Sequence, residues 1–249
     1  MSISLLVHTC DNYSRYWPGM LFSLDFNWNY FNIPVYWASE EIVLHNHPFE
    51  SRGLEYRPNK SIRQILTGKT DKNGFSTRMR IALEQIPTKW VIYIQEDMWL
   101  LSSPSETLFS ELLLFAETMK ADSIKIHTKL HYYDSYILEP TEHVIKGERI
   151  LKYSQTENYL HSHNATIWNR EYLLRHLRDG EDPWTNEVEG SKRMSAEQPH
   201  NHYHYNIHWY SQPGVCEMGE DARDFLTLAP ILDDRMNLKL FFEQQWSQI

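Results

Sequence analysis

The stretch Val91-Ile92-Tyr93-Ile94-Gln95-Glu96-Asp97-Met98-Trp99-Leu100 decides the fold of this chain. Its first half is rich in the β-branched and aromatic residues that are typical of a buried strand. The strand ends in two adjacent carboxylates, and apolar residues resume directly afterwards. Ligands of open α/β sheets bind at the carboxyl ends of the strands. The pattern therefore predicts a ligand site at Glu96 and Asp97; the competing interpretation is a strand that ends in a solvated turn.

Such an acidic pair indicates metal chemistry. Carboxylate oxygens are the ligands that Mg²⁺ and Mn²⁺ prefer, and these cations also bind phosphate. We therefore expect Mn²⁺ or Mg²⁺ as cofactor and a phosphorylated donor as substrate.

The segments around this strand predict alternating strands and helices in the first half of the chain. Strands are expected at residues 3–8, 34–38, 89–94 and 123–126. Apolar residues at three- and four-residue steps predict helices at residues 13–30, at 76–86 with Ser76 as its cap, and from Pro104 onwards. Residues 39–74 are expected to form a polar loop. The alternation predicts an α/β fold with a Rossmann-like, mostly parallel central sheet that is flanked by helices.

The second half changes character. It predicts short strands at residues 136–138, 143–145, 150–153 and 164–168, helices at 170–178 and 184–196, a strand or turn at 213–216 and a last helix at 233–246. There is no internal repeat and no linker rich in Pro or Gly. We therefore expect a single domain over residues 1–249, with a nucleotide-binding half at 1–126 and a smaller acceptor-side half at 127–249.

Composition narrows the partners and the compartment. The net charge of −9, from 24 basic and 33 acidic residues, argues against a nucleic-acid partner. Two cysteines fit a reducing cytosol and cannot form a disulfide framework. The first residues lack the pattern of a signal peptide, and no apolar run approaches the ~18 residues of a transmembrane span. We expect a cytoplasmic protein without a transmembrane segment.

Two arginines, Arg78 and Arg80, lie near the start of the predicted helix at 76–86. Free N–H groups at a helix start together with Arg side chains can hold a diphosphate. The alternative is a solvated helix face. Because the chain contains neither a P-loop nor a dinucleotide fingerprint, phosphate would have to be held by a metal and by Arg.

A histidine-rich tract contains His200, His202, His204 and His208. The first three share one face if the tract is a strand, because side chains alternate with a period of two. His204 is the candidate that could add a nitrogen ligand to a carboxylate-bound Mn²⁺. A surface loop is the alternative.

Pro183 is well placed to start a helix, which puts Glu187 one turn inside it. Trp184 and Glu187 then occupy neighbouring positions on the helix. An aromatic ring beside a carboxylate is suited to holding a sugar and accepting its hydroxyl proton; a capped helix with a solvated Glu187 is the alternative.

Three pieces of the chain resemble a family of glycosyltransferases with the GT-A fold, found in bacteria and large DNA viruses. They are the strand 90–94 with its Gln95-Glu96-Asp97 ending, the segment 165–174 with its Trp-x-Arg-x-x-Leu pattern, and the helix Pro183-Trp184-x-x-Glu187-x-x-Gly190-Ser191. Their order and spacing match, and the resemblance spans most of the chain. The first piece departs from the Asp-x-Asp pattern usual in the family.

The resemblance implies a nucleotide-sugar donor, most often a UDP-sugar, and a divalent metal. It places the site residues in distinct roles: Asp97 as metal ligand with Glu96 as its neighbour, Thr9, Asp11 and Tyr13 around the nucleoside, Arg78 near the donor, Trp184 on a sugar ring and Glu187 as base.

The sequence thus predicts a metal-dependent glycosyltransferase that moves a sugar to a hydroxyl of a glycan or another acceptor. Two alternatives stay open: a nucleotide-sugar- or glycan-binding protein without catalysis, and a metal-dependent phosphohydrolase built on the histidine tract and the acidic pair.

Overall fold

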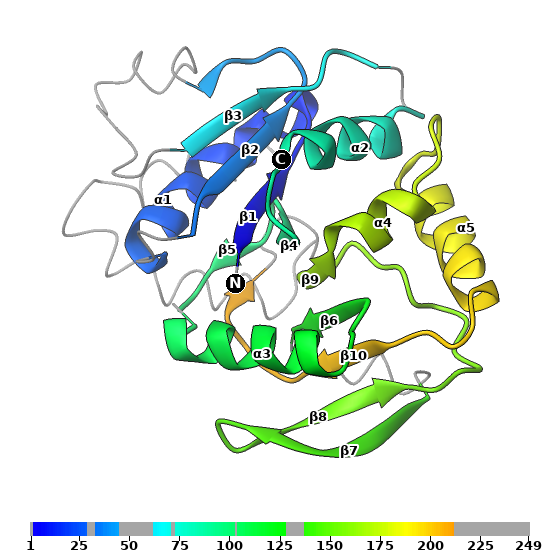
Figure 1. The fold of residues 1–249 in the computed structure, drawn as a ribbon. Helices are drawn as coiled ribbons and strands as arrows, with labels where there is room; N and C mark the ends of the chain where they lie inside the picture. Colours follow the sequence, from blue (N-terminus) through cyan, green and yellow to red (C-terminus); the bar gives the residue numbers. More distant parts are fainter. Residues whose placement is uncertain are drawn as a thin grey trace.

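The computed structural model describes residues 2–28, 33–44, 62–70, 73–102, 104–127 and 137–211 (Figure 1). The predicted elements at 213–216 and 233–246 lie outside these residues.

One nine-stranded sheet carries strands from both halves of the chain, in the order β3-β2-β1-β4-β9-β6-β10-β8-β7. The strands are β1 (Ile3–His8), β2 (Val35–Ser39), β3 (Ile62–Leu66), β4 (Trp90–Gln95), β6 (Ser123–Ile126), β7 (Leu138–Ile145), β8 (Glu148–Tyr153), β9 (Thr166–Asn169) and β10 (His202–Tyr205). A small second sheet pairs β5 (Trp99–Leu100) with β11 (Tyr210–Ser211).

The sheet is parallel on its first side and mixed beyond β4. Strands β1, β2, β3 and β4 pair in parallel. Strand β9 then pairs antiparallel with both β4 and β6, so β4 and β6 still run in the same direction. Because β10 is parallel to β6, the carboxyl ends of β1, β4, β6 and β10 lie along one edge of the sheet.

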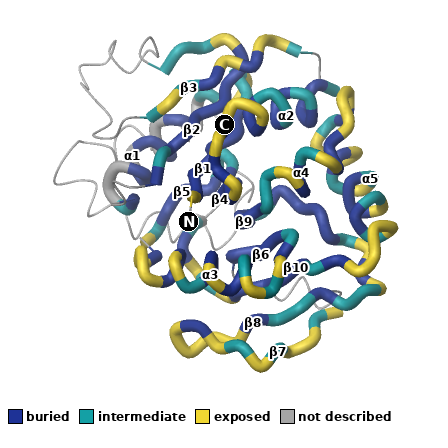
Figure 2. The backbone as a smooth tube through the Cα atoms, in the orientation of Figure 1, coloured by how far each residue is buried: buried dark blue, intermediate teal, exposed yellow. Residues whose placement is uncertain are grey.

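Helices cover both faces of the sheet. Helix α1 (Trp17–Asn27), which follows a 3₁₀ turn at Asp11–Tyr16, and α3 (Glu106–Thr118) pack on one face. The other face carries α2 (Phe75–Gln85), α4 (Arg170–His176) and α5 (Pro183–Ala196). Strand β4 is buried in the middle of the protein (Figure 2). Both of its faces are covered, since Ile92 and Ile94 join the first core and Val91 and Tyr93 the second. Burial on two faces explains why its sequence is a continuous apolar run.

The α/β, mostly parallel architecture is confirmed, and several local predictions need correction. The expected polar loop at 39–74 contains β3, which the short run Ile62–Leu66 builds on the sheet edge. The two strands expected at 136–138 and 143–145 are one strand, β7, with an irregularity between Pro140 and Val144. The alternative of a surface loop for the histidine tract is wrong, because His200, His202 and His204 are buried.

Ser76 does not cap α2, which begins at Phe75. Its hydroxyl instead donates to the carbonyl of Arg178 at 2.5 Å and accepts from the N–H of Glu181. The serine therefore ties the start of α2 to the loop that leads into α5.

Among the described residues, no helix has the length and apolar character that crossing a membrane requires.

Candidate active site

The acidic pair lies directly after β4; Glu96 is buried and Asp97 is half-buried. Burial raises the pKa of Glu96, and the neighbouring charge of Asp97 raises it further. Burial also raises the pKa of Asp97. The Asp97 Oδ1 atom is buried and has no hydrogen-bond partner among the described residues. A buried acceptor without a partner is costly, so this oxygen is available to a ligand.

The loops that follow β1 and β2 are locked together beside this pair. The Asp11 carboxylate accepts N–H groups of Glu40, Glu41 and Ile42 at 3.1 to 3.4 Å. In return, the Glu40 carboxylate accepts the N–H of Asp11 at 3.0 Å. Asp11 therefore acts here by fixing the backbone of both loops at the carboxyl edge of the sheet.

Arg78 reaches the same place from α2. Its buried guanidinium forms an ion pair with Glu40 at 3.1 Å. The positive charge of Arg78 and the nearby hydroxyl of Thr9 lower the pKa of Glu96, against the larger effect of burial. The structure therefore brings Thr9, Asp11, Arg78 and the acidic pair together at one edge of the sheet.

Two other predicted residues near the donor lie at the surface. Tyr13, on the 3₁₀ turn after β1, is 48% exposed. Arg80, which the sequence grouped with Arg78, forms exposed ion pairs with Asp179 and Glu84. Of the two arginines, only Arg78 faces the acidic pair.

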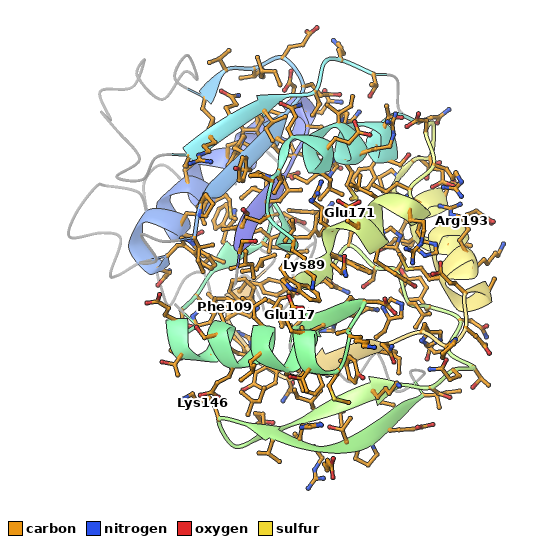
Figure 3. All side chains as sticks on the ribbon, viewed as in Figure 1. Lys89, Phe109, Glu117, Lys146, Glu171 and Arg193 are labelled. Atoms are coloured by element: carbon orange, nitrogen blue, oxygen red, sulfur yellow. The ribbon has the colours of Figure 1, made fainter. Side chains whose placement is uncertain are left out.

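Helix α5 is anchored at its start and along one side. Asp182 caps its N-terminus by accepting the N–H of Thr185 at 2.8 Å, and Pro183 follows at the first turn. Arg193, labelled in Figure 3, forms two hydrogen bonds with the Glu181 carboxylate at 2.7 and 2.9 Å. These contacts fix the position of Glu187 between them.

Both oxygens of Glu187 accept hydrogen bonds from the segment that precedes β9. The Tyr159 hydroxyl donates to Oε2 and the N–H of His163 donates to Oε1, each at 2.5 Å. Tyr93 is a buried phenol near both Glu187 and the acidic pair. Burial raises its pKa well above the usual value, and the charges of Glu96, Glu187 and Asp97 raise it further. The base candidate and the metal candidates therefore share one neighbour.

The remaining residues of the Pro-Trp-x-x-Glu-x-x-Gly-Ser helix hold the same segment. The Ser191 hydroxyl accepts the N–H of His161 at 2.9 Å and donates to its carbonyl at 3.1 Å. At Gly190, an added Cβ would lie 2.4 Å from Nδ1 of His161. The spacing that gives the motif its specificity is thus explained by close packing of residues 159–163 against α5.

This packing predicts the effect of replacing Gly190 with Ala. Helix propensity alone would stabilise the fold by ~1 kcal/mol. The collision with the buried His161 ring should reverse the sign and lower the free energy of unfolding by about 1–3 kcal/mol. Urea denaturation measures the change, and replacing the exposed Val188 with Ala on the same helix is the control. A stabilised Gly190→Ala variant would contradict the contact.

The structure does not bring His204 to the acidic pair. Its strand β10 is separated from β4 by β9 and β6, which amounts to about 14 Å at the usual strand spacing. The ring of His204 instead packs edge-on against His127, with centroids 4.9 Å apart.

Trp184 and Trp168, the tryptophans of the two motifs in the second half of the chain, differ in exposure. Trp184 is 77% exposed at the start of α5 and is free to meet a ligand from solvent. Trp168 is 1% exposed and packs edge-on against His161 and His202. Only Trp184 offers an accessible ring.

The acidic pair fits a divalent cation that is shared with a substrate. Among the residues that the structure describes, no group of three or more His, Cys, Asp or Glu is arranged to hold a metal ion. Mg²⁺ is commonly bound by one or two carboxylates together with substrate phosphates, so a complete protein cage is not required. The unpartnered oxygen of Asp97 and the adjacent Glu96 supply such a partial set.

Several residues of the site were missed in the sequence. Glu40 directly follows β2, just as Glu96 directly follows β4. A carboxylate at the end of an apolar strand is therefore a signal that could have identified Glu40. Tyr159 and His163 precede β9 in an irregular segment, and their role depends on how that segment packs on α5. No pattern in the sequence reveals such packing.

Comparison with known proteins identifies the fold. No protein-family model and no curated protein sequence matches the chain. Among solved structures, S. aureus TarS 1–349 in complex with UDP-GlcNAc aligns with a TM-score of 0.56 at 14% identity, over 90% of this chain and 61% of that one. The UTP-bound UGPase from Acinetobacter baumannii has a TM-score of 0.56 at 8% identity, over 100% and 99% of the two chains.

This chain has the fold of nucleotide-diphospho-sugar transferases. A CMP:2-keto-3-deoxy-manno-octonic acid synthetase in complex with CTP also shares it, with a TM-score of 0.51 at 10% identity over 94% of this chain and 99% of that chain. The chain spans about 60% of the TarS fragment without ligand, which aligns with a TM-score of 0.53. The expected GT-A, Rossmann-like fold is therefore confirmed, and the structures that share it include complexes with UDP-GlcNAc, UTP and CTP.

Proposed function

We propose that the chain is a metal-dependent glycosyltransferase that moves a sugar from a nucleotide-sugar donor, a UDP-sugar, to a hydroxyl of a glycan or another acceptor. One observation carries the proposal: the acidic pair at the carboxyl end of β4 and a carboxylate that is held in place on α5 are both near Tyr93. The two sites supply the two functions that transfer needs, which are neutralisation of the leaving diphosphate and removal of the acceptor proton.

On the donor side, Arg78 and the loops joined by Asp11 lie beside the acidic pair. A divalent cation held by Asp97 and Glu96, when bound, would neutralise the charge that develops on the diphosphate. Arg78 adds a fixed positive charge there. Thr9 and Tyr13, at the carboxyl end of β1, are proposed to lie around the nucleoside.

On the acceptor side, Glu187 is proposed to take the proton of the attacking hydroxyl. A carboxylate has about four lone-pair sites, and the bonds from Tyr159 and His163 use two of them. The same two donors hold the carboxylate of the base in one orientation. The exposed ring of Trp184, one turn earlier, can stack on an acceptor sugar.

A second candidate is nucleotidyl transfer, which joins a nucleotide to a sugar phosphate. It is favoured by the two nucleotidyltransferase structures that this fold matches over 99% of their own length. Glycosyl transfer ranks first because nucleotidyl transfer assigns no task to Glu187.

The released product separates the candidates. The protein would be incubated with Mn²⁺, a panel of UDP-sugars and simple glycan acceptors; free UDP with a glycosylated acceptor supports transfer. Pyrophosphate release from UTP and a sugar 1-phosphate would support nucleotidyl transfer, inorganic phosphate would support a phosphohydrolase, and donor binding without any product would support a binding protein.

Replacing Glu187 with Gln tests the base. Loss of a general base should lower the transfer rate by about 10²–10⁴-fold and leave donor affinity unchanged, because Glu187 contacts the acceptor and not the nucleotide. Glu189→Gln is the matched control, since Glu189 is on the same helix and pairs with Lys192 at the surface. Normal turnover by Glu187→Gln would remove this residue as base.

A further inference from the structure

A cluster of four aromatic and imidazole rings lies between the two halves of the candidate site. His8 packs edge-on against Phe75 with ring centroids 4.8 Å apart, and Phe75 packs edge-on against His163 at 4.5 Å. Tyr93 lies 6.1 Å from His8 and 6.0 Å from His163. The rings come from β1, α2, β4 and the segment before β9, so tertiary packing assembles them.

This cluster contains buried polar atoms that lack partners. His8 is 2% exposed, and neither of its ring nitrogens has a hydrogen-bond partner among the described residues. His163 is 7% exposed; its Nε2 meets the carbonyl of Pro183 at 3.2 Å, and its Nδ1 has no partner. Since Nε2 must carry the proton to bond a carbonyl, Nδ1 is left as an acceptor. Native proteins rarely leave three such buried atoms unsatisfied in one place.

The position of the cluster follows from its charged neighbours. His8 is the last residue of β1 and pairs in register with Gln95, the residue before Glu96, so it lies at the donor end of the site. At the other end, the N–H of His163 is bonded to Glu187. A sugar that is being transferred must lie between the leaving phosphate and the base that activates the acceptor.

We propose that His8 and His163 bind hydroxyl groups of the transferred sugar and thereby set which sugar the enzyme accepts. The inference rests on the proposed function and adds a substrate-binding role for two residues outside the metal and base positions. Burial lowers the pKa of both imidazoles, so both are neutral at pH 7. A neutral imidazole presents one donor and one acceptor, and a sugar hydroxyl offers the same pair of functions in return.

A metal ion fits this cluster less well than a sugar. Among the described residues, these imidazoles form no group of three ligands with a carboxylate or cysteine. A polyhydroxylated ring instead satisfies several neutral donors and acceptors at once, and a site built to bond a hydroxyl discriminates strongly against analogues that lack it.

Calorimetry of the full chain with UDP, UDP-glucose and UDP-GlcNAc, each with Mn²⁺, tests the inference. His8→Phe keeps a ring against Phe75 and removes both nitrogens. We expect it to weaken binding of the preferred UDP-sugar by about 10-fold, the loss of roughly one hydrogen bond, and to change UDP affinity by less than about 2-fold. Its melting temperature should stay equal or rise, because two unsatisfied buried atoms are removed.

The matched control is His200→Phe. His200 is 0% exposed, and its ring nitrogens also lack partners among the described residues, but it precedes β10, at the opposite edge of the sheet from the carboxyl ends. This variant should not change the difference between UDP-sugar and UDP affinity. Should His8→Phe fail to fold, His8→Leu and His163→Phe provide the same comparison.

The outcomes separate this inference from the proposed function. Wild-type protein that binds neither UDP nor a UDP-sugar would overturn both. A wild type that binds and transfers, with a His8→Phe variant that loses UDP and UDP-sugar affinity equally or loses neither, would overturn only the role of His8 and His163.

Discussion

Replacing Asp97 with Asn is expected to lower the transfer rate at least about 100-fold and to raise the stability of the ligand-free protein. The amide keeps the shape of the side chain and removes the charge that a divalent cation requires. The loss of rate follows because the diphosphate would leave without compensation of its charge.

The gain in stability follows from the pKa of the pair. Folding raises the pKa of each carboxyl group, so the folded state holds the proton more tightly than the unfolded state does. As the pH rises from the unfolded pKa to the folded pKa, the free energy of unfolding therefore decreases. Glu96 and Asp97 are both raised, chiefly by burial, so at pH 7–8 their ionisation opposes folding. Removing one charge also removes the repulsion that acts on the other.

Thermal shift and turnover assays measure the two effects in the same protein. Wild type should be stabilised by Mn²⁺ and UDP added together, and Asp97→Asn should lose this response. Asp179→Asn is the control, because Asp179 is an exposed carboxylate that pairs with Arg80. Full metal-dependent turnover by Asp97→Asn would contradict the assignment of the metal site.

The sequence predicted those parts of the fold and the site that depend on local pattern. The apolar run at 91–94 with its acidic ending placed β4 and the pair correctly, since burial on both faces leaves a continuous apolar signature. Pro183 and the residues after it predicted α5 correctly, because helix capping and helix periodicity are also local properties of the sequence.

The parts that were missed depend on contacts between distant segments. Strand β9 inserts antiparallel between β4 and β6, and the sequences of β4 and β6 contain no pattern that predicts this insertion. Strand β3 at the sheet edge is too short and too polar to be recognised as a strand from its sequence. The role of the histidines was missed for the same reason. Spacing suggested a shared metal site, whereas the fold distributes these rings through the core on the face that carries α2, α4 and α5.

This burial of histidine predicts a second large effect, a loss of stability between pH 7.5 and 5.5. Burial lowers the pKa of six histidines, namely His8, His161, His163, His176, His200 and His202. A histidine whose folded pKa lies below the unfolded pKa of 6.5 is neutral in both states above pH 6.5. As the pH falls from 6.5 towards the folded pKa, the unfolded state takes up a proton that the folded state does not, and the free energy of unfolding decreases.

The size of the effect follows from linkage. Each strongly shifted histidine loses about 1.4 kcal/mol of stability over this interval, so the three with the largest shifts, His8, His161 and His202, together lose about 4 kcal/mol. The raised carboxyl groups of Glu96 and Asp97 act in the opposite direction, since their protonation favours the folded state, and they offset part of the loss. The lowered pKa values of His163, His176 and His200 add to the loss, so the net change should be destabilising.

His202 offers the cleanest test, because it lies outside the candidate site. Its ring is fully buried, with Nδ1 2.7 Å from the Ser123 hydroxyl and Nε2 3.1 Å from the Tyr172 hydroxyl. Urea denaturation of His202→Gln at pH 7.5 and 5.5 should show a pH-dependent loss that is about 1.4 kcal/mol smaller than in wild type, whatever constant offset the substitution adds. His208→Gln, at an exposed position, should leave the wild-type difference unchanged. Identical pH dependence in His202→Gln and wild type would show that this ring is protonated equally in the folded and unfolded states, and that its burial does not contribute to acid sensitivity.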